Sequence, residues 1–187
     1  MRFSEYERMV TENDISVKAN MTADLEVAPI ESGDWERVRQ IYLEGIATGQ
    51  ATFETAAPTW EQWDAAHLKF ARLVGRRGDE LLGWAALSPV SQRCVYGGVA
   101  EVSVYVSSAH RGAGIGRRLL DSLIEESERN GIWTLQAGIF PENASSISLH
   151  MRCDFREVGR RERVGKLNGI WRDTVLLERR SKIVGID

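Results

Sequence analysis

Three closely spaced glycines form the part of this 187-residue chain that is best suited to bind an anion. They lie in the segment Arg111–Gly116, after the β-branched run Val99–Val106 and before apolar residues at helical spacing. A strand that leads through glycines into a helix presents unpaired backbone amides, and glycine lets a phosphate approach the backbone closely. We therefore expect a phosphate-binding loop at residues 111–117. The alternative is an ordinary left-handed turn that leads into a helix.

The spacing of the glycines distinguishes between kinds of phosphate-binding loop. Counted from Gly112, both the dinucleotide-binding loop G-x-G-x-x-G and the P-loop G-x-x-x-x-G-K require a glycine where this chain has Arg117. Neither pattern fits. The spacing that fits is R-x-x-G-x-G, running from Arg111 to Gly116.

The hydrophobic pattern predicts the elements that position this loop. Asp34 is expected to cap the first helix, and Thr59 and Gln62 form a capping box for the second. The expected helices cover residues 35–46, 60–67, 115–130 and 144–152. The expected strands cover residues 25–30, 70–74, 81–87, 99–106, 134–140, 155–166 and 169–177.

This order of elements is neither a strict βαβ alternation nor an all-β pattern. It predicts an α/β (α+β) domain with a mixed, mostly antiparallel sheet and helices on both faces. We assign residues 25–181 to this domain. Residues 1–24 form an expected N-terminal extension, and residues 182–187 an expected C-terminal tail.

The composition argues against several classes of protein. A net charge of −3 is unlike that of a general nucleic-acid binder. The two cysteines and three widely separated histidines predict neither a disulfide framework nor a metal site. No apolar run approaches membrane-spanning length, and the first residues do not resemble a signal peptide. We expect a cytoplasmic protein that uses no metal and binds neither nucleic acid nor membrane.

The strand and glycine loop together resemble the pyrophosphate-binding signature of the GNAT N-acetyltransferases, which use acetyl-CoA. Residues 25–180 are similar to one branch, the phosphinothricin acetyltransferase-like enzymes, which include arsinothricin-resistance members. The matching segments are Ala51–Glu54, Glu101–Val106, Asn143, Ser148–His150 and Gly169–Asp173. In this fold the strand before the glycine loop and the strand after the long helix are parallel and splay apart. Acetyl-CoA lies in the split.

The resemblance implies how acetyl-CoA is held. Backbone groups of the central strand would bind the pantetheine arm, and one of their amides would face the thioester carbonyl, where an oxyanion develops. Loop amides would bind the pyrophosphate, with Arg117 and Arg118 as candidates for the outer phosphates. The expected cofactor-binding residues are Val104, Tyr105, Val106, Arg111, Gly112, Ala113, Gly114, Ile115, Gly116, Arg117 and Asn143.

Two residues are candidates for the proton transfers of acetylation. An ammonium ion cannot attack a thioester, so a base must first take its proton. Glu101 lies on the central strand and is our candidate base; the alternative is a strand glutamate that faces solvent. His150 occupies the helix position where many acetyltransferases have a tyrosine acid. We assign it as acid or proton relay, against the alternative of a packed histidine that orients substrate.

The acceptor is expected to meet residues from several segments. An amino-acid acceptor has a carboxylate, for which the bidentate guanidinium of Arg93 is the candidate partner. The expected substrate-binding residues are Phe53, Glu54, Arg93, Tyr96 and Trp171. For each aromatic residue alone, core packing is the competing interpretation.

The sequence thus predicts an N-acetyltransferase that modifies the primary amine of a small amino-acid-like compound, such as phosphinothricin, methionine sulfone, methionine sulfoximine or arsinothricin. Attack would be direct, within a ternary complex, and the resemblance implies a homodimer and a role in detoxification or resistance. Two alternatives stay open. One is acetylation of a polyamine, an aminoglycoside or a protein N-terminus, and the other is a non-catalytic module that binds acetyl-CoA.

One position departs from the family pattern. The family has Cys-Gly-Phe where this chain has Cys153, Asp154 and Phe155. A residue that follows a helix end here adopts the left-handed conformation, which Asp tolerates better than most residues. We expect Asp154 to have a positive φ. Cys153 is expected to be a packed thiol and not a nucleophile.

Overall fold

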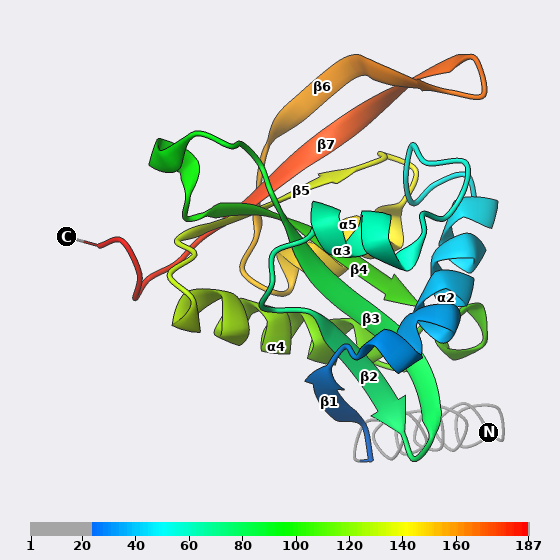
Figure 1. Cartoon of the computed structure of the whole chain (residues 1–187). Helices are drawn as coiled ribbons and strands as arrows, with labels where there is room; N and C mark the ends of the chain where they lie inside the picture. The colour runs from blue at the N-terminus through cyan, green and yellow to red at the C-terminus, as the bar shows by residue number, and fades with distance from the viewer. Residues whose placement is uncertain (1–23, 187) are drawn as a thin grey trace, which may run out of the picture.

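The computed structural model describes residues 24–186 (Figure 1). The extension expected over residues 1–24 therefore lies outside the described residues, except for Asp24. No described helix is long and apolar enough to cross a membrane.

The described strands form one seven-stranded sheet in the order β1-β2-β3-β4-β5-β7-β6. Neighbouring strands are antiparallel, except that β4 and β5 are parallel, which confirms the mixed, mostly antiparallel sheet. The strands are β1 Glu26–Pro29, β2 Leu73–Arg77, β3 Glu80–Pro89, β4 Val99–Val106, β5 Thr134–Ile139, β6 Arg156–Leu167 and β7 Ile170–Arg180.

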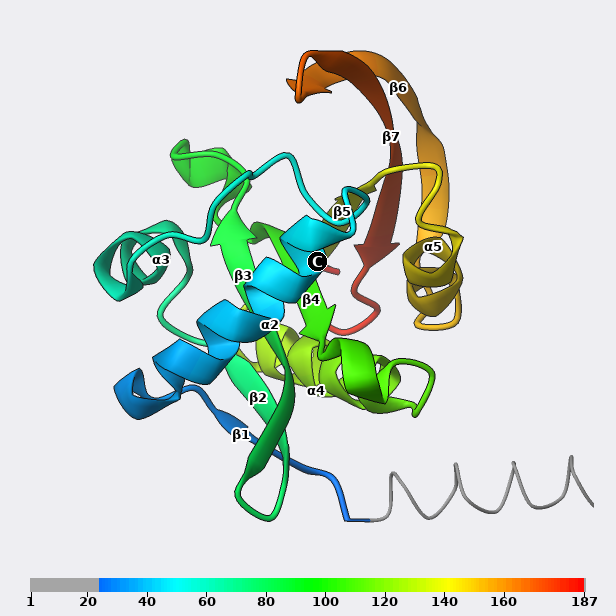
Figure 2. The ribbon, with the colours of Figure 1, turned by 90° about the vertical axis from the view of Figure 1, so that its right-hand side faces the viewer.

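Helices cover both faces of the sheet, as expected (Figure 2). The helices α2 Trp35–Ala47 and α3 Trp60–Ala66 lie on one face, where Val38, Ile41 and Trp63 pack against β2 and β3. The helices α4 Ile115–Arg129 and α5 Ala144–Met151 lie on the other face, over the larger core. On α4 the buried side chains recur at three- and four-residue spacing, which produces its apolar face.

The parallel pair β4–β5 parts after a short paired stretch. Pairing runs from Val99 to Glu101 on β4, opposite Thr134 to Gln136 on β5. Beyond Glu101 the remaining residues of β4 pair with β3 alone. The backbone groups of β4 that would face β5 are therefore free for a ligand, because a strand presents its polar groups on both edges.

The hairpin β6–β7 extends beyond the rest of the sheet (Figure 1). β7 pairs with β5 only over Val175–Arg180, so residues 161–174 pair with each other alone. We call residues 161–174 the arm. Its exposed apolar side chains include Ile170 and Trp171. Its basic residues Arg161, Arg163 and Lys166 are also exposed, whereas Arg172 is partly buried.

Two local predictions are wrong. The strand expected over residues 70–74 covers Leu73–Arg77, because Ala71 has a φ of 52° and the chain is still turning there. Asp34 does precede α2, but its carboxylate does not cap that helix. It accepts from the amide of Glu31 at 3.0 Å and pairs with Arg76.

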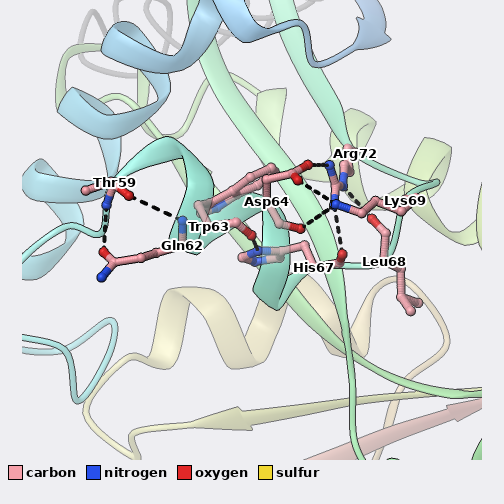
Figure 3. A network of polar contacts seen from close by, with 8 residues as sticks. All are labelled: Thr59, Gln62, Trp63, Asp64, His67, Leu68, Lys69 and Arg72. Carbon is pink, nitrogen blue, oxygen red and sulfur yellow. Dashed lines mark hydrogen bonds and ion pairs between the residues drawn. The ribbon is translucent and has the colours of Figure 1, made fainter.

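A polar network fixes α3 at both ends (Figure 3). The capping box between Thr59 and Gln62 is present, as predicted. At the other end Arg72 donates to the carbonyls of Asp64 at 2.8 Å and His67 at 2.7 Å. Its Nη1 also bonds the Asp64 carboxylate at 2.5 Å. A cation at a helix C-terminus satisfies carbonyls that have no partner within the helix. This network anchors one end of the loop at residues 48–59, which we call the α2–α3 loop.

Candidate functional site

A cavity of about 520 Å³ lies between the glycine loop, the open end of β4, α2 and α5. Most of the residues expected to bind the cofactor lie in its wall. Those residues are Val104, Tyr105, Val106, Arg111, Gly112, Gly114, Ile115, Gly116, Arg117 and Asn143. Ala113 is the exception, since it is buried in the large core.

The glycine loop has backbone geometry that suits an anion. Gly112 has a φ of 78° and Gly114 a φ of 82°, in the left-handed region that an L side chain adopts only at a cost. Gly114 is the N-cap of α4, and Arg118 N donates to Gly114 O at 3.1 Å. The amides that precede Arg118 are therefore first-turn amides, which the positive end of the helix makes suitable for phosphate.

The two basic side chains expected here differ in their partners. Arg117 bonds Asp121 at 2.7 Å and the carbonyl of Arg152 at 2.6 Å, and these contacts tie α4 to the end of α5. Arg118 is exposed and is not among the residues that line the cavity. Of these two candidates for the outer phosphates, only Arg117 lines the cavity.

A second cavity of about 290 Å³ opens beyond the point where β4 and β5 part. Its wall includes the two candidate proton-transfer residues, Glu101 and His150, and two expected substrate residues, Phe53 and Glu54. The two cavities share the wall residues Ala51, Val104, Tyr105, Asn143 and Ser146. We call these shared residues the collar.

Glu101 is the last residue of β4 that pairs with β5, and its side chain lines the second cavity. Desolvation raises the pKa of its carboxyl above the usual 4.5, while the charge of Arg161 and a hydrogen bond from the Gly138 amide oppose that rise. The Gly138 amide lies on the edge of β5 that faces the split. A carboxylate with a raised pKa, in a cavity, has the properties of a general base.

His150 is 4% exposed and lies beneath the second cavity. Its Nδ1 lies 2.9 Å from the carbonyl oxygen of Ser146, which can only accept, so Nδ1 carries the proton. Burial lowers the pKa of the ring, and Nε2 is buried without a partner in the described structure. A neutral ring whose one proton is already bonded suits an acceptor or relay better than an acid.

Asn143 connects the collar to the α2–α3 loop. Its Oδ1 accepts from the amide of Ser146 at 3.2 Å and caps α5, and its Nδ2 donates to Gln50 O at 3.2 Å. This leaves one Nδ2 hydrogen for a ligand. The residue therefore fixes the start of α5 relative to the loop that covers both cavities.

An arginine from the base of the arm holds the α2–α3 loop in place. Arg172 donates to Gly49 O at 3.3 Å and to the Glu142 carboxylate at 3.1 Å. Its guanidinium lies 4.4 Å from the ring centroid of Phe140, and that ring makes an edge contact with Phe53 at 4.7 Å. Arg172 thus supports the wall of the second cavity from outside.

Three expected substrate residues lie elsewhere. Arg93 and Tyr96 lie in the exposed connection between β3 and β4, where the guanidinium is 5.5 Å from the tyrosine ring centroid. Trp171 lies on the arm, 52% exposed, with the Lys166 ammonium 4.8 Å from its ring centroid. None of the three lines either of the two cavities described above.

Sequence reasoning missed several wall residues. On α5, the side chains of Ser145, Ser146, Leu149 and Arg152 line the first cavity. They recur at helical spacing after Asn143, so the face of α5 could have been deduced once Asn143 was assigned to the cofactor. Phe140 and Gly138 gave no such signal, because their place in the wall depends on where β5 leaves β4. Within residues 24–186, no group of three or more His, Cys, Asp or Glu side chains could hold a metal ion.

Comparisons with known proteins agree with this geometry. The profile of the acetyltransferase (GNAT) family matches residues 35–155. A phosphinothricin N-acetyltransferase from Alcaligenes faecalis is 34% identical over 82% of this chain and 81% of its own length. An L-methionine sulfoximine/L-methionine sulfone acetyltransferase from Pseudomonas aeruginosa is 36% identical over 71% of this chain and 73% of its own. A GNAT phosphinothricin acetyltransferase from Sinorhizobium meliloti, crystallised with acetyl-CoA, superposes with a TM-score of 0.79 at 25% identity. That match covers 88% of this chain and 92% of the other.

Proposed function

The chain belongs to the acetyltransferase (GNAT) family, and from this membership and the two joined cavities we propose that it acetylates the primary amine of a small amino-acid-like compound. The donor is acetyl-CoA. The observation that carries the proposal is the collar, which joins an anion-binding cavity to a smaller one that contains a carboxylate with a raised pKa. Relatives named as phosphinothricin and methionine sulfoximine/sulfone acetyltransferases support this class of acceptor.

The described residues fit acetyl-CoA. The amides at the start of α4 suit a pyrophosphate, and the unpaired edge of β4 after Glu101 suits an extended chain that contains amides. We propose Val104, Tyr105 and Val106 as the backbone that holds the pantetheine arm, and Arg111 to Arg117 as the phosphate end. When bound, acetyl-CoA supplies an activated acetyl group.

We propose that Glu101 takes the proton from the acceptor ammonium, so that the free amine attacks directly. A backbone amide of residues 104–106 would stabilise the oxyanion that develops on the acetyl carbonyl. His150 serves as a relay or acceptor beside Glu101, since its one ring proton is bonded to the Ser146 carbonyl. Both residues line the second cavity, where the acceptor would bind.

The second cavity, where the acceptor would bind, has acidic but no basic side chains in its wall. Its wall contains the carboxylates of Glu54 and Glu101 and no arginine or lysine. Those carboxylates suit an ammonium group. We retain Arg93 as the proposed partner of an acceptor carboxylate, and because it lies outside this wall in a single chain, it requires either a movement of its loop or a second copy.

We also propose a homodimer in the cytoplasm that detoxifies amino-acid analogues. Support for the dimer comes from large exposed apolar side chains, among them Val95 at 66% and Ile170 at 67%. Support for the cytoplasm comes from two unpaired cysteines, Cys94 and Cys153, since reducing compartments keep thiols free. Support for detoxification is chemical, because acetylation removes the charge of an amine that mimics an amino acid.

A free-thiol assay tests the proposal. The wild-type chain is incubated with acetyl-CoA and separately with phosphinothricin, methionine sulfone, methionine sulfoximine, arsinothricin, a polyamine and an aminoglycoside. We expect turnover with at least one amino-acid analogue and none with the two polycations. Turnover with the polycations alone would replace the acceptor class. A rise in melting temperature with acetyl-CoA, but no thiol release with any amine, would instead indicate a non-catalytic binding module.

A further inference from the structure

We infer that the hydroxyl of Ser146 is a catalytic group, which donates a hydrogen bond to the sulfur of the departing CoA and passes a proton to it. The inference rests on the proposed function, because it assigns a role at the same site. Ser146 belongs to the collar, so it borders the phosphate-binding cavity and the acceptor cavity at once. The thioester that connects donor and acceptor must lie at this junction.

The hydroxyl of Ser146 is free to act. Its amide donates to Asn143 Oδ1 at 3.2 Å, and its carbonyl accepts from His150 Nδ1 at 2.9 Å. Within residues 24–186 its Oγ makes no hydrogen bond. The neighbouring Ser145 differs, because its hydroxyl donates to Asn143 Oδ1 at 3.0 Å and it borders only the first cavity.

Ser146 also lies where negative charge is favoured. It is in the first turn of α5, which begins at Ala144 and has Asn143 as its N-cap. First-turn amides and the aligned peptide dipoles stabilise an anion at this end of a helix. A thiolate that forms at the collar would therefore meet both a hydroxyl donor and the positive end of α5.

His150 does not compete for this role. In the neutral ring the proton is on Nδ1, bonded to the carbonyl of Ser146, and Nε2 can only accept. The same bond fixes the backbone of Ser146. The two residues are one helical turn apart on the same face of α5, so His150 positions the serine while Ser146 contacts the sulfur.

The proton balance closes without a further reagent. Glu101 removes one proton from the acceptor ammonium, and the free amine forms a bond to the acetyl carbon. The nitrogen then has one surplus proton. As the carbon–sulfur bond breaks and its electron pair moves to sulfur, Ser146 gives its hydroxyl proton to sulfur and takes the surplus proton from nitrogen. The products are the amide and free CoA thiol, Ser146 is unchanged, and Glu101 releases the proton taken from the ammonium to solvent.

The first measurement compares turnover of Ser146→Ala, Ser146→Thr and Ser122→Ala with that of the wild type. We expect kcat to fall by about 10- to 100-fold in Ser146→Ala, with the KM for acetyl-CoA changed less than about threefold. Ser146→Thr retains a hydroxyl and should recover most of the activity. Ser122→Ala, which changes a serine on α4 that lines neither cavity, should have a kcat near that of the wild type. Equal kcat in Ser146→Ala and the wild type, or a loss confined to KM, would overturn the inference.

The second measurement does not depend on turnover. The pKa of the thiol of CoA bound to each protein is measured from the ultraviolet absorbance of the thiolate. We expect this pKa to be about one unit higher with Ser146→Ala than with the wild type, since the variant lacks a donor to the thiolate. No difference would overturn the inference. If the wild type acetylates no amine, the proposed function fails, and the thiol pKa still decides on Ser146.

Discussion

The two cavities meet at one collar but are built in different ways. The first cavity, which we propose binds the donor, takes its phosphate end from one continuous segment, the end of β4 and the loop into α4. The second cavity, which we propose binds the acceptor, takes its wall from the α2–α3 loop, β4, β5 and α5. Its candidate proton-transfer groups are the side chains of Glu101 and His150. On the proposed assignment, a local motif would bind the ligand that the whole family shares, and a tertiary arrangement would bind the ligand that differs between relatives.

Removal of the proposed base, Glu101, should cause the largest loss of activity and leave the first cavity intact. In Glu101→Gln we expect kcat to fall by about 10²- to 10⁴-fold, because the amide cannot accept the ammonium proton. Acetyl-CoA should still raise the melting temperature, since the phosphate end is intact. Glu157→Gln, an exposed glutamate on β6, is the matched control and should keep full activity. A parallel loss of acetyl-CoA binding would show that the two cavities are not separable.

Strain in the glycine loop should weaken acetyl-CoA binding, the property that Glu101→Gln is expected to leave intact. Gly114→Ala places a side chain at a φ of 82°, at a cost of about 1–2 kcal/mol, and should weaken acetyl-CoA binding about tenfold by moving the loop amides. Isothermal titration with acetyl-CoA measures this. Gly78→Ala is the control, because Gly78 has a φ of 55° in the β2–β3 turn, away from both cavities. If Gly78→Ala weakens binding equally, general destabilisation explains the result.

A third variant tests whether the arm supports the acceptor side alone. Arg172→Met removes the bonds to Gly49 and Glu142, so the α2–α3 loop should loosen and the KM for the acceptor should rise about fivefold or more. The KM for acetyl-CoA should change less. Arg160→Met is the matched control, since Arg160 pairs with Asp173 at 2.7 Å and makes no bond to the loop. Equal changes in both KM values would contradict the assignment.

The pH dependence of kcat/KM tests whether Glu101 is the base. Burial raises the pKa of this carboxyl, so kcat/KM should rise with pH through a midpoint above 4.5, as the base loses its proton. The positive charge of Arg161 lowers that pKa, so Arg161→Gln should move the midpoint upward, by less than about one unit. Arg163→Gln is the control, because the charge of Arg163 acts on Asp173. A midpoint that moves downward in Arg161→Gln would exclude this electrostatic account.

The smallest expected effect concerns stability. Asp154 has a φ of 65°, as predicted from the family's glycine at this position. Asp154→Gly should therefore raise the free energy of unfolding by up to ~1 kcal/mol without changing activity. The exposed pair with Lys182, at 3.4 Å, contributes little against this. A thermal melt that shows no gain would remove the prediction.

The sequence predicted what depends on neighbours along the chain. The glycine loop, the capping box of α3 and the positive φ of Asp154 follow from local patterns, and the structure has all three. The site of parting between β4 and β5 depends on pairing between strands distant in sequence, so Gly138 and Phe140 were missed. Arg93 was assigned by charge and motif alone, which do not specify the direction in which an exposed loop faces.

The point where β4 and β5 separate also determines how far a ligand can extend along the free edge of β4. Glu101 is the last paired residue, and the free edge that would bind the donor begins immediately after it. On the proposed binding mode, an extended donor chain that adds to this edge would stop where the two strands close, which would place the acetyl group at a fixed distance from Glu101. The sheet would therefore limit how far the donor chain enters along β4. Changes in the α2–α3 loop would then alter the acceptor cavity without changing the point on β4 at which the donor chain stops.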